Sequence, residues 1–130
     1  RKCLEAIERG DEQVVVWGDG SPTREFLYAS DAAEGIVGGA ERYNGEQPVN
    51  LGSGEEISIK DLVETIAELT GYQGRLVWDT SQPNGQPRRS LDTSRATELF
   101  AFTAQTKLAQ GLRETVEWYR NHIENGGNAS

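Results

Sequence analysis

The sequence predicts a small mixed α/β domain, with about four helices and four or five short strands. Two observations carry this prediction. Short apolar runs, at 14–17 and 75–79, are bounded by glycine, proline and polar turn residues, which is typical of strands. Between them, at 58–71, apolar residues recur at helical spacing. A chain of 130 residues is long enough for one domain with a single core.

The expected elements alternate along the chain. The first helix starts without a capping residue, so we expect the chain to be a piece of a longer protein. In chain order we expect a helix over 1–9, strands over 14–17 and 24–28, a helix over 30–43, strands over 48–51 and 57–59, a helix that follows Ser58, a strand over 75–79, a short helix over 94–99 that Ser94 caps, and a last helix that begins at 106.

Cap chemistry locates the helix that follows Ser58. Ser58 and Asp61 have the spacing of a capping box, in which each side chain can satisfy a free backbone N–H of the first turn. Gly71 follows the last apolar residue of the repeat and can adopt the left-handed conformation of a C-terminal stop. This is the best-defined helix in the sequence.

The helix expected over 30–43 has a different character. Ser30 or Asp31 can cap its start. Gly35, Gly38 and Gly39 weaken it by roughly 1 kcal/mol each relative to alanine. Three glycines in one helix make sense only where another part of a protein packs closely against that face, so we expect such a contact.

The charge and cysteine content exclude several classes of function. The formal net charge is −8, which argues against general binding to nucleic acid or to an anionic membrane. No apolar run approaches the ~20 residues of a membrane span, and the N-terminus shows no signal-peptide pattern. Cys3 is the only cysteine, so we expect a cytoplasmic protein without internal disulfides. Because His122 is the only histidine, no metal site is expected.

The segment 14–28 holds the candidate binding residues. Trp17 and Arg24 lie seven residues apart across a turn that contains Gly18, Gly20 and Pro22. An indole can stack on a base and a guanidinium can bind phosphate with two parallel hydrogen bonds, so the pair suits a nucleotide. The alternative is a core tryptophan and a surface arginine. Neither Gly18-Asp-Gly20 nor the later Gly-Ser-Gly completes the dinucleotide fingerprint, so no complete Rossmann domain is expected.

Several motifs together resemble the GDP-L-fucose synthase family, a branch of the extended short-chain dehydrogenases (the NAD-dependent epimerase/dehydratase family). They cover nearly the whole chain. They are Trp-Gly-x-Gly-x-Pro-x-Arg-Glu-Phe-Leu at 17–27, Asn-Leu-Gly-Ser-Gly at 50–54, Pro-x-Gly-x-Pro-Arg-Arg at 83–89, Leu-Asp-x-Ser-Arg at 91–95 and Gly-Leu-Arg-Glu-Thr-Val-Glu-Trp-Tyr at 111–119. The resemblance implies the C-terminal substrate domain of that family and contacts to a GDP-sugar.

The matching positions imply which residues bind the substrate. Trp17 would lie against the nucleotide, and Arg24 and Arg89 would bind the pyrophosphate. Lys2 would add a further cationic contact. At Arg89 the family usually has lysine, and at Lys2 it usually has arginine, so the charge is kept but the hydrogen-bonding geometry differs.

The family's catalytic residues have no match here. The family needs a Tyr-x-x-x-Lys pair, but the residues four positions after the four tyrosines are Ala32, Gln47, Leu76 and Ile123. We therefore expect residues 1–124 to form a nucleotide-sugar-binding domain, without a catalytic residue or an NADP site, followed by a disordered tail at 125–130. The chain alone is expected to be inactive, although the family is an NADP-dependent epimerase-reductase.

Two alternatives to GDP-sugar binding stay open. One is a structural module that kept the fold and lost the ligand. The other is a half-enzyme that needs a separate nucleotide-binding chain. In the family, the region around 30–51 packs on the nucleotide-binding domain, so the glycine-bearing helix face and a strand with Val49 and Leu51 are expected to lie uncovered. An uncovered apolar face favours self-association or a partner chain.

Overall fold

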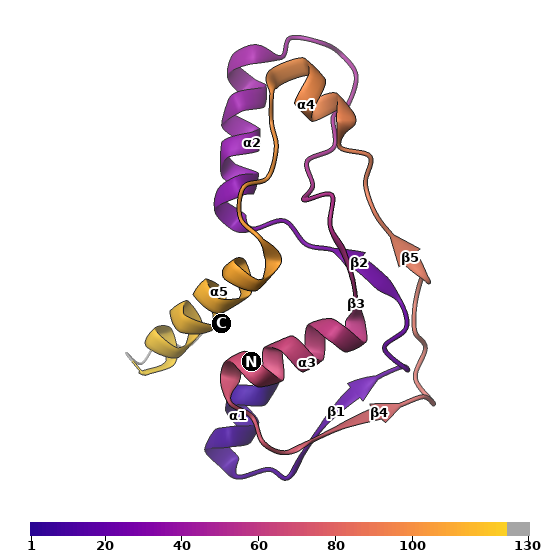
Figure 1. Cartoon of the computed structure of the whole chain (residues 1–130), viewed down its shortest axis with the longest axis vertical. Coiled ribbons are helices and arrows are strands. Elements are labelled where there is room, and N and C mark those ends of the chain that lie inside the picture. The colour runs from indigo at the N-terminus through magenta and orange to yellow at the C-terminus, as the bar shows by residue number, and fades with distance from the viewer. Residues whose placement is uncertain (125–130) are drawn as a thin grey trace.

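The computed structural model, which describes residues 1–124, contains two small β-sheets, one near the middle of the molecule and the other at its lower end in Figure 1. β1 (Gln13–Trp17) pairs in parallel with β4 (Arg75–Asp79). In the other sheet, β2 (Thr23–Glu25) is central, with β3 (Glu56–Ser58) antiparallel to it on one side and β5 (Arg88–Arg89) parallel on the other. The tail expected at 125–130 lies outside the described residues.

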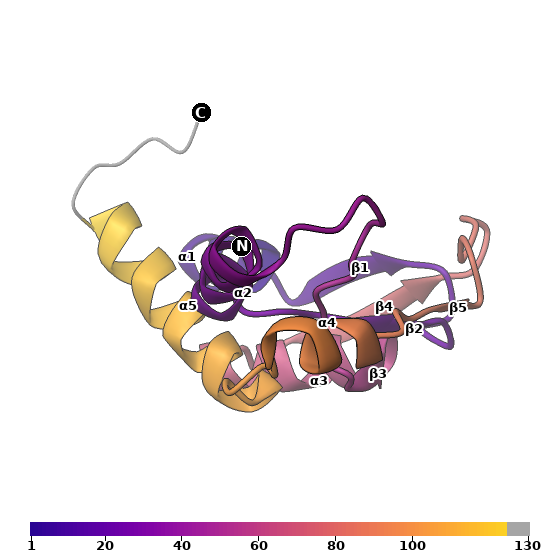
Figure 2. The same ribbon diagram turned by 90° about the horizontal axis from the view of Figure 1, so that it is seen from above.

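Five helices accompany these strands within residues 1–124. They are α1 (Lys2–Arg9), α2 (Ala29–Arg42), α3 (Ile59–Thr70), α4 (Ser94–Phe100) and α5 (Leu108–Glu124). α1 contacts β1 and α3, α3 contacts α5, and α2 contacts α4. Figures 1 and 2 agree that α5 and β5 lie on opposite sides of the molecule. The predicted mixed α/β class is confirmed, and no described helix is both long and apolar enough to cross a bilayer.

The buried core lies where α1, β1 and α3 meet. The tyrosine after α3 closes it, because the Tyr72 hydroxyl donates a hydrogen bond to the Asp11 carbonyl at 3.1 Å. Partly buried Val16, Ile66 and Leu76 pack against the cluster. The buried members are Cys3, Ala6, Val14, Ala67 and Tyr72.

The predicted cap at Ser58 and the predicted stop at Gly71 are confirmed for α3, whereas Asp61 binds the Ser58 hydroxyl in place of a backbone N–H. Ser58 is the N-cap residue, and its Oγ accepts a hydrogen bond from the Asp61 backbone N–H at 3.0 Å. The Ser58 hydroxyl in turn donates to the Asp61 carboxylate at 2.7 Å. Gly71 ends the helix with φ of 72°. These interactions join residues close in sequence, which is why local patterns sufficed to predict them.

The predicted strand over 24–28 is wrong in extent. β2 covers only Thr23–Glu25, and it belongs to a different sheet from β1. Gly18 and Gly20, with φ of 82° and 79°, turn the chain out of the first sheet. The turn then joins the start of α3, where Lys60 N–H donates to the Gly20 carbonyl at 2.9 Å. Residues 26–28 instead line an apolar hollow against α3 and α5.

The strand predicted over 48–51 is absent. Side chains hold this segment instead of a β-ladder: Asn50 donates to the Asp92 carbonyl at 3.2 Å, and Arg95 donates to the Pro48 carbonyl at 2.9 Å. Leu51 packs under α2. The segment is therefore anchored to 92–95 without forming a sheet.

The predicted helix caps need two corrections. The N-cap residue of α2 is Tyr28, without a side-chain cap hydrogen bond, and Asp31 lies in the first turn. Asp31 is buried and accepts hydrogen bonds from the backbone and hydroxyl of Thr106. The N-cap residue of α4 is Thr93, one residue before Ser94. A polar residue near a helix start can accept a hydrogen bond from the helix backbone or from a donor elsewhere in the chain. Asp31 accepts from the distant residue Thr106 and not from the first turn of α2.

The glycine face of α2 is covered by the chain itself, so the expectation that it lies uncovered is wrong. A Cβ atom added at Gly35 would lie 2.9 Å from the Phe102 ring and 3.0 Å from Leu51. Gly38 and Gly39 face the Phe100 ring at ordinary contact distance. The predicted close packing is thus confirmed at Gly35.

Gly35 and Gly38 offer a matched pair of alanine substitutions. Helix propensity alone favours alanine at both by about 1 kcal/mol. At Gly35 the new methyl overlaps Phe102 and Leu51, which costs about 1–3 kcal/mol. At Gly38 it would lie 3.9 Å from Phe100, without overlap. In urea denaturation we expect Gly35→Ala to lower the free energy of unfolding and Gly38→Ala to raise it; equal effects would contradict the packing described.

Candidate functional site

Arg24 and Arg89 lie side by side on neighbouring strands. Their Cα atoms are partners in the parallel pairing of β2 with β5. A hydrogen bond from the Thr23 N–H to the Pro87 carbonyl, at 2.9 Å, supports this register. Like charges at directly neighbouring positions of a sheet repel each other. The fold therefore concentrates positive charge at one place in a chain of net charge −8.

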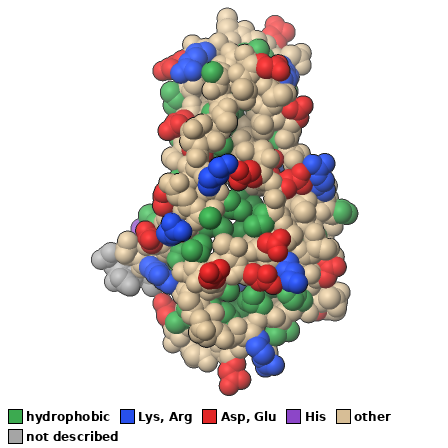
Figure 3. Space-filling model, viewed as in Figure 1, with side chains coloured by type: hydrophobic (Ala, Val, Ile, Leu, Met, Phe, Trp, Pro, Cys, Tyr) green, Lys and Arg blue, Asp and Glu red, His purple; other side chains and the backbone are tan. Residues whose placement is uncertain are grey.

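A hollow of about 270 Å³ opens beside these two arginines. This volume is close to the lower end of the range for small-molecule sites. Figure 3 shows apolar side chains gathered across the middle of the face seen in Figure 1, with acidic and basic side chains around them. The hollow is lined by Arg24, Glu25, Leu27, Leu51, Gly52, Arg89 and Leu91.

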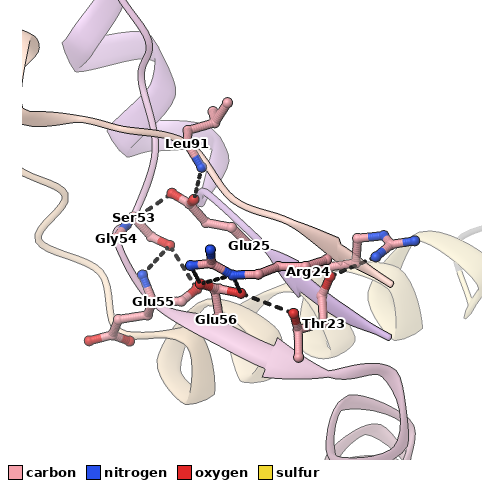
Figure 4. Close-up of polar contacts among 9 residues, drawn as sticks. Thr23, Arg24, Glu25, Ser53, Gly54, Glu55, Glu56 and Leu91 are labelled. Carbon is pink, nitrogen blue, oxygen red and sulfur yellow. Dashed lines mark hydrogen bonds and ion pairs between the residues drawn. The ribbon is translucent and has the colours of Figure 1, made fainter. Parts of the chain in front are cut away.

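The neighbouring carboxylates do not neutralise the arginine pair. Glu56 binds Arg88, whose Nε lies 2.9 and 3.0 Å from the two carboxylate oxygens. Glu25 accepts hydrogen bonds from the Gly54 and Leu91 backbone N–H groups, both at 2.9 Å (Figure 4). Within residues 1–124, neither Arg24 nor Arg89 forms an ion pair.

The Arg24 side chain is directed away from both acids. Figure 4 shows its guanidinium extending away from Glu25 and Glu56. Its Nη1 donates to the Thr23 carbonyl at 2.6 Å, and its Nη2 lies 3.6 Å from the place where a Cβ on Gly85 would stand. The remaining donors of the guanidinium are therefore available to an anion.

Arg88 lowers the pKa of Glu56 to about 2, mainly through its hydrogen bond to the carboxylate, with a smaller contribution from Thr23. Because this pKa lies below the ordinary value of 4.5, the ion pair stabilises the fold above pH 4.5 and is lost as the pH falls through about 2. A carbon-13 NMR titration of the Glu56 carboxyl should show a midpoint near 2. Arg88→Ala should move this midpoint up towards 4.5, and a wild-type midpoint already near 4.5 would contradict the ion pair.

Trp17 is an exposed residue and not part of the core. It ends β1, opposite Asp79 of β4, and 66% of its surface is accessible. Its indole therefore presents a free face. Trp17 does not line the hollow beside Arg24, because β1 and β2 belong to different sheets.

Lys2 also lies apart from the arginine pair. Its Nζ donates a hydrogen bond to the Val15 carbonyl at 3.2 Å, which joins the start of α1 to β1. It lines a hollow of about 300 Å³ between α1 and β1, which shares no lining residue with the arginine hollow. Of the four predicted binding residues, the structure thus brings together Arg24 and Arg89.

Two residues of the loop between β4 and β5 also shape this region, and sequence reasoning missed them. Asn84 accepts a hydrogen bond from the Asp19 N–H at 2.8 Å, which ties the loop to the turn before β2. Gly85 then lies beside the Arg24 guanidinium. An Asn-Gly pair between prolines is ordinary turn chemistry, so the sequence carried no signal of these contacts.

The glycine turn at 18–20 does not fit the pyrophosphate of a dinucleotide cofactor. A Cβ on Gly18 would collide with the Asn84 side chain. A Cβ on Gly20 would lie 2.7 Å from the Trp78 ring and 2.8 Å from Lys60. The space that these glycines leave is filled by the chain's own side chains, so the residues do not match an NADP-binding loop.

Comparison with known proteins agrees with the motifs. The sequence model of the NAD dependent epimerase/dehydratase family matches residues 1–52. GDP-L-fucose synthase 1 of Arabidopsis thaliana is 42% identical over 125 residues, which are 96% of this chain and 38% of that protein. Residues 1–52 thus match that family, and the chain as a whole resembles part of a GDP-L-fucose synthase. GDP-L-fucose synthase of Escherichia coli (strain K12) is 37% identical over 128 residues, covering 92% of this chain and 40% of that protein.

The solved structures give the same result. The crystal structure of a GDP-L-fucose synthetase from Naegleria fowleri bound to NADP superimposes with a TM-score of 0.89 and 32% identity. The match covers 98% of this chain and 40% of that one. The resemblance to the GDP-L-fucose synthase family is thus confirmed. The chain spans about two fifths of the length of the relatives it matches, such as 38% of the Arabidopsis protein.

Proposed function

We propose that this chain is the part of a GDP-L-fucose synthase-like epimerase/reductase that binds a GDP-sugar. The observation that carries the proposal is the in-register pair Arg24 and Arg89, which forms no ion pair among the described residues and lies beside a hollow. Two guanidinium groups can hold a pyrophosphate with parallel, charge-assisted hydrogen bonds. The GDP-L-fucose synthase relatives support GDP as the nucleotide.

The remaining predicted contacts have weaker but distinct physical roles. The exposed Trp17 indole offers a face on which a guanine base can stack. Lys2 adds a positive charge near the same strand. Both roles require the ligand to extend from the arginine pair towards β1. We propose that none of the four predicted binding residues holds NADP. The chain alone is proposed to be catalytically inactive.

Isothermal titration calorimetry with GDP tests the proposal, with GDP-mannose as a second ligand and guanosine as the control. We expect weak binding of GDP and GDP-mannose that becomes weaker with added salt, because the contacts are ionic. Guanosine lacks the phosphates and should give far less heat. If millimolar GDP causes neither heat nor a chemical-shift change, the proposal is wrong.

A second candidate, an interaction module, is favoured by the outer surface of α2. Ile36 and Val37 are 64% and 56% exposed there, although the glycine face of the helix is covered. Adjacent exposed aliphatic residues favour self-association or a nucleotide-binding partner chain. Sedimentation across micromolar concentrations distinguishes the cases: association lost in Ile36→Lys supports the module, and a monomer throughout removes the self-association.

A further inference from the structure

The two faces of the sheet β3-β2-β5 carry different kinds of charge. Side chains alternate between the faces of a strand, so Arg24 and its partner Arg89 project to one face. Thr23, Glu25 and Glu56 belong to the other face, as the pairing of β2 with β3 shows. One face thus presents the arginine pair, and the opposite face holds the carboxylates.

The carboxylate face forms a connected set of hydrogen bonds. Glu56 starts on β3 and reaches across β2 to bind Arg88 on β5 with two carboxylate oxygens. Thr23 on β2 donates to the same carboxylate at 2.9 Å. Glu56 therefore ties all three strands together.

Glu25 holds the chain on the other side of Arg89. One oxygen accepts from the Leu91 N–H, two residues after Arg89, and the other accepts from the Gly54 N–H (Figure 4). Glu25 and Glu56 are Cα partners, and they avoid a repulsive contact because each has its own donors. The chain is thus anchored on both sides of Arg89, by Arg88 directly before it and by the Leu91 N–H two residues after it.

β5 itself contributes little to its own placement. It is only two residues long and lies at the edge of the sheet. So short a strand forms few ladder hydrogen bonds, so side-chain contacts must hold it. The Arg88 side chain is 71% exposed, yet all three of its hydrogen bonds to a carboxylate go to Glu56.

We propose that Glu25 and Glu56 are positioning residues, which hold Arg89 beside Arg24 through the backbone and side-chain groups on either side of it in the chain. The proposal rests on the proposed function for the role of the arginine pair. It adds that anion binding depends on two acids that form no ion pair with Arg24 or Arg89 and act by holding β5 in place. They also keep their own negative charge engaged, so that neither acid competes with the ligand for the arginines.

A charge exchange between Glu56 and Arg88 tests this. The variants are Glu56→Arg, Arg88→Glu and the double exchange, with GDP affinity measured by calorimetry. Each single variant should weaken GDP binding about tenfold, since it puts two like charges together and frees β5. The double exchange should restore the affinity to within about threefold, because the ion pair is rebuilt with its signs reversed. Rescue would show that the ion pair, and not either side chain alone, carries the effect.

Amide hydrogen exchange supplies a readout that needs no ligand. In the single variants the Thr23 N–H, which binds the Pro87 carbonyl, should exchange at least about tenfold faster than in the wild type, with Ala67 of α3 as the internal reference. The double exchange should restore its protection. Glu25→Ala should release the Leu91 and Gly54 amides in the same manner, and Glu25→Gln should retain part of their protection.

Glu55→Ala is the matched control, because Glu55 is the neighbour of Glu56 but forms an ion pair with Lys107. It should change neither GDP affinity nor Thr23 exchange. Wild-type exchange and affinity in the single variants, or no rescue in the double exchange, would overturn the positioning role. If the wild type binds no GDP, the proposed function fails alone, and amide exchange still decides whether the acids hold β5.

Discussion

Arg24→Ala is expected to weaken GDP binding by about 10- to 100-fold. Hydrogen bonds to a charged group contribute about 1.5–3 kcal/mol, which corresponds to that range of affinity. We expect a large loss of affinity because the Thr23 carbonyl fixes the Arg24 guanidinium and no carboxylate within residues 1–124 competes for it. Calorimetry under the conditions used for the wild type measures the loss.

Two comparison variants sharpen this result. Arg113→Ala removes an equal charge from the exposed surface of α5 and should leave GDP affinity unchanged. Arg24→Lys keeps the charge but loses the two-pronged geometry, so it should fall between wild type and alanine. A loss of affinity in Arg113→Ala as large as in Arg24→Ala would show that total charge, and not the arginine pair, determines binding.

Asp31→Ala is expected to lower the free energy of unfolding by about 2–3 kcal/mol. Asp31 is 4% exposed and accepts hydrogen bonds from the Thr106 N–H at 2.9 Å and from its hydroxyl at 3.1 Å. Alanine would leave both donors without this acceptor. It would also remove a negative charge from the first turn of α2, where the helix dipole favours one.

Urea denaturation measures this effect, with Glu34→Ala as the control. Glu34 is an exposed acid on the same helix, so its loss should change stability by less than about 0.5 kcal/mol. Asp31→Asn should lie between the two, because its amide oxygen still accepts. If Asp31→Ala and Glu34→Ala are equally stable, the contact with Thr106 contributes nothing to the fold.

Local chemistry explains which parts of the fold could be predicted. Ser58, Asp61 and Gly71 determine the ends of α3 by contacts within a few residues, so their pattern was sufficient. β4 was predicted with its observed bounds, because its apolar run is flanked by turn residues. The family motifs, such as Trp-Gly-x-Gly-x-Pro-x-Arg, are also local in sequence.

Contacts between distant segments explain the predictions that were wrong. Residues 48–51 have the composition of a strand, but side-chain bonds from Asn50 and Arg95 hold them to another segment. Asp31 has the position of a cap, but Thr106 lies 75 residues away and binds it. No local pattern reports the partner that a polar group will meet after folding.

The sequence by itself determined the ends of α3, the extent of β4, and the motifs that resemble the GDP-L-fucose synthase family. Only the tertiary structure decided that β1 and β2 separate into different sheets and that Arg24 pairs with Arg89 while Trp17 and Lys2 lie elsewhere. The physical reason is strand register. It depends on hydrogen bonds and ion pairs between distant segments, such as Glu56 with Arg88, which local spacing does not encode.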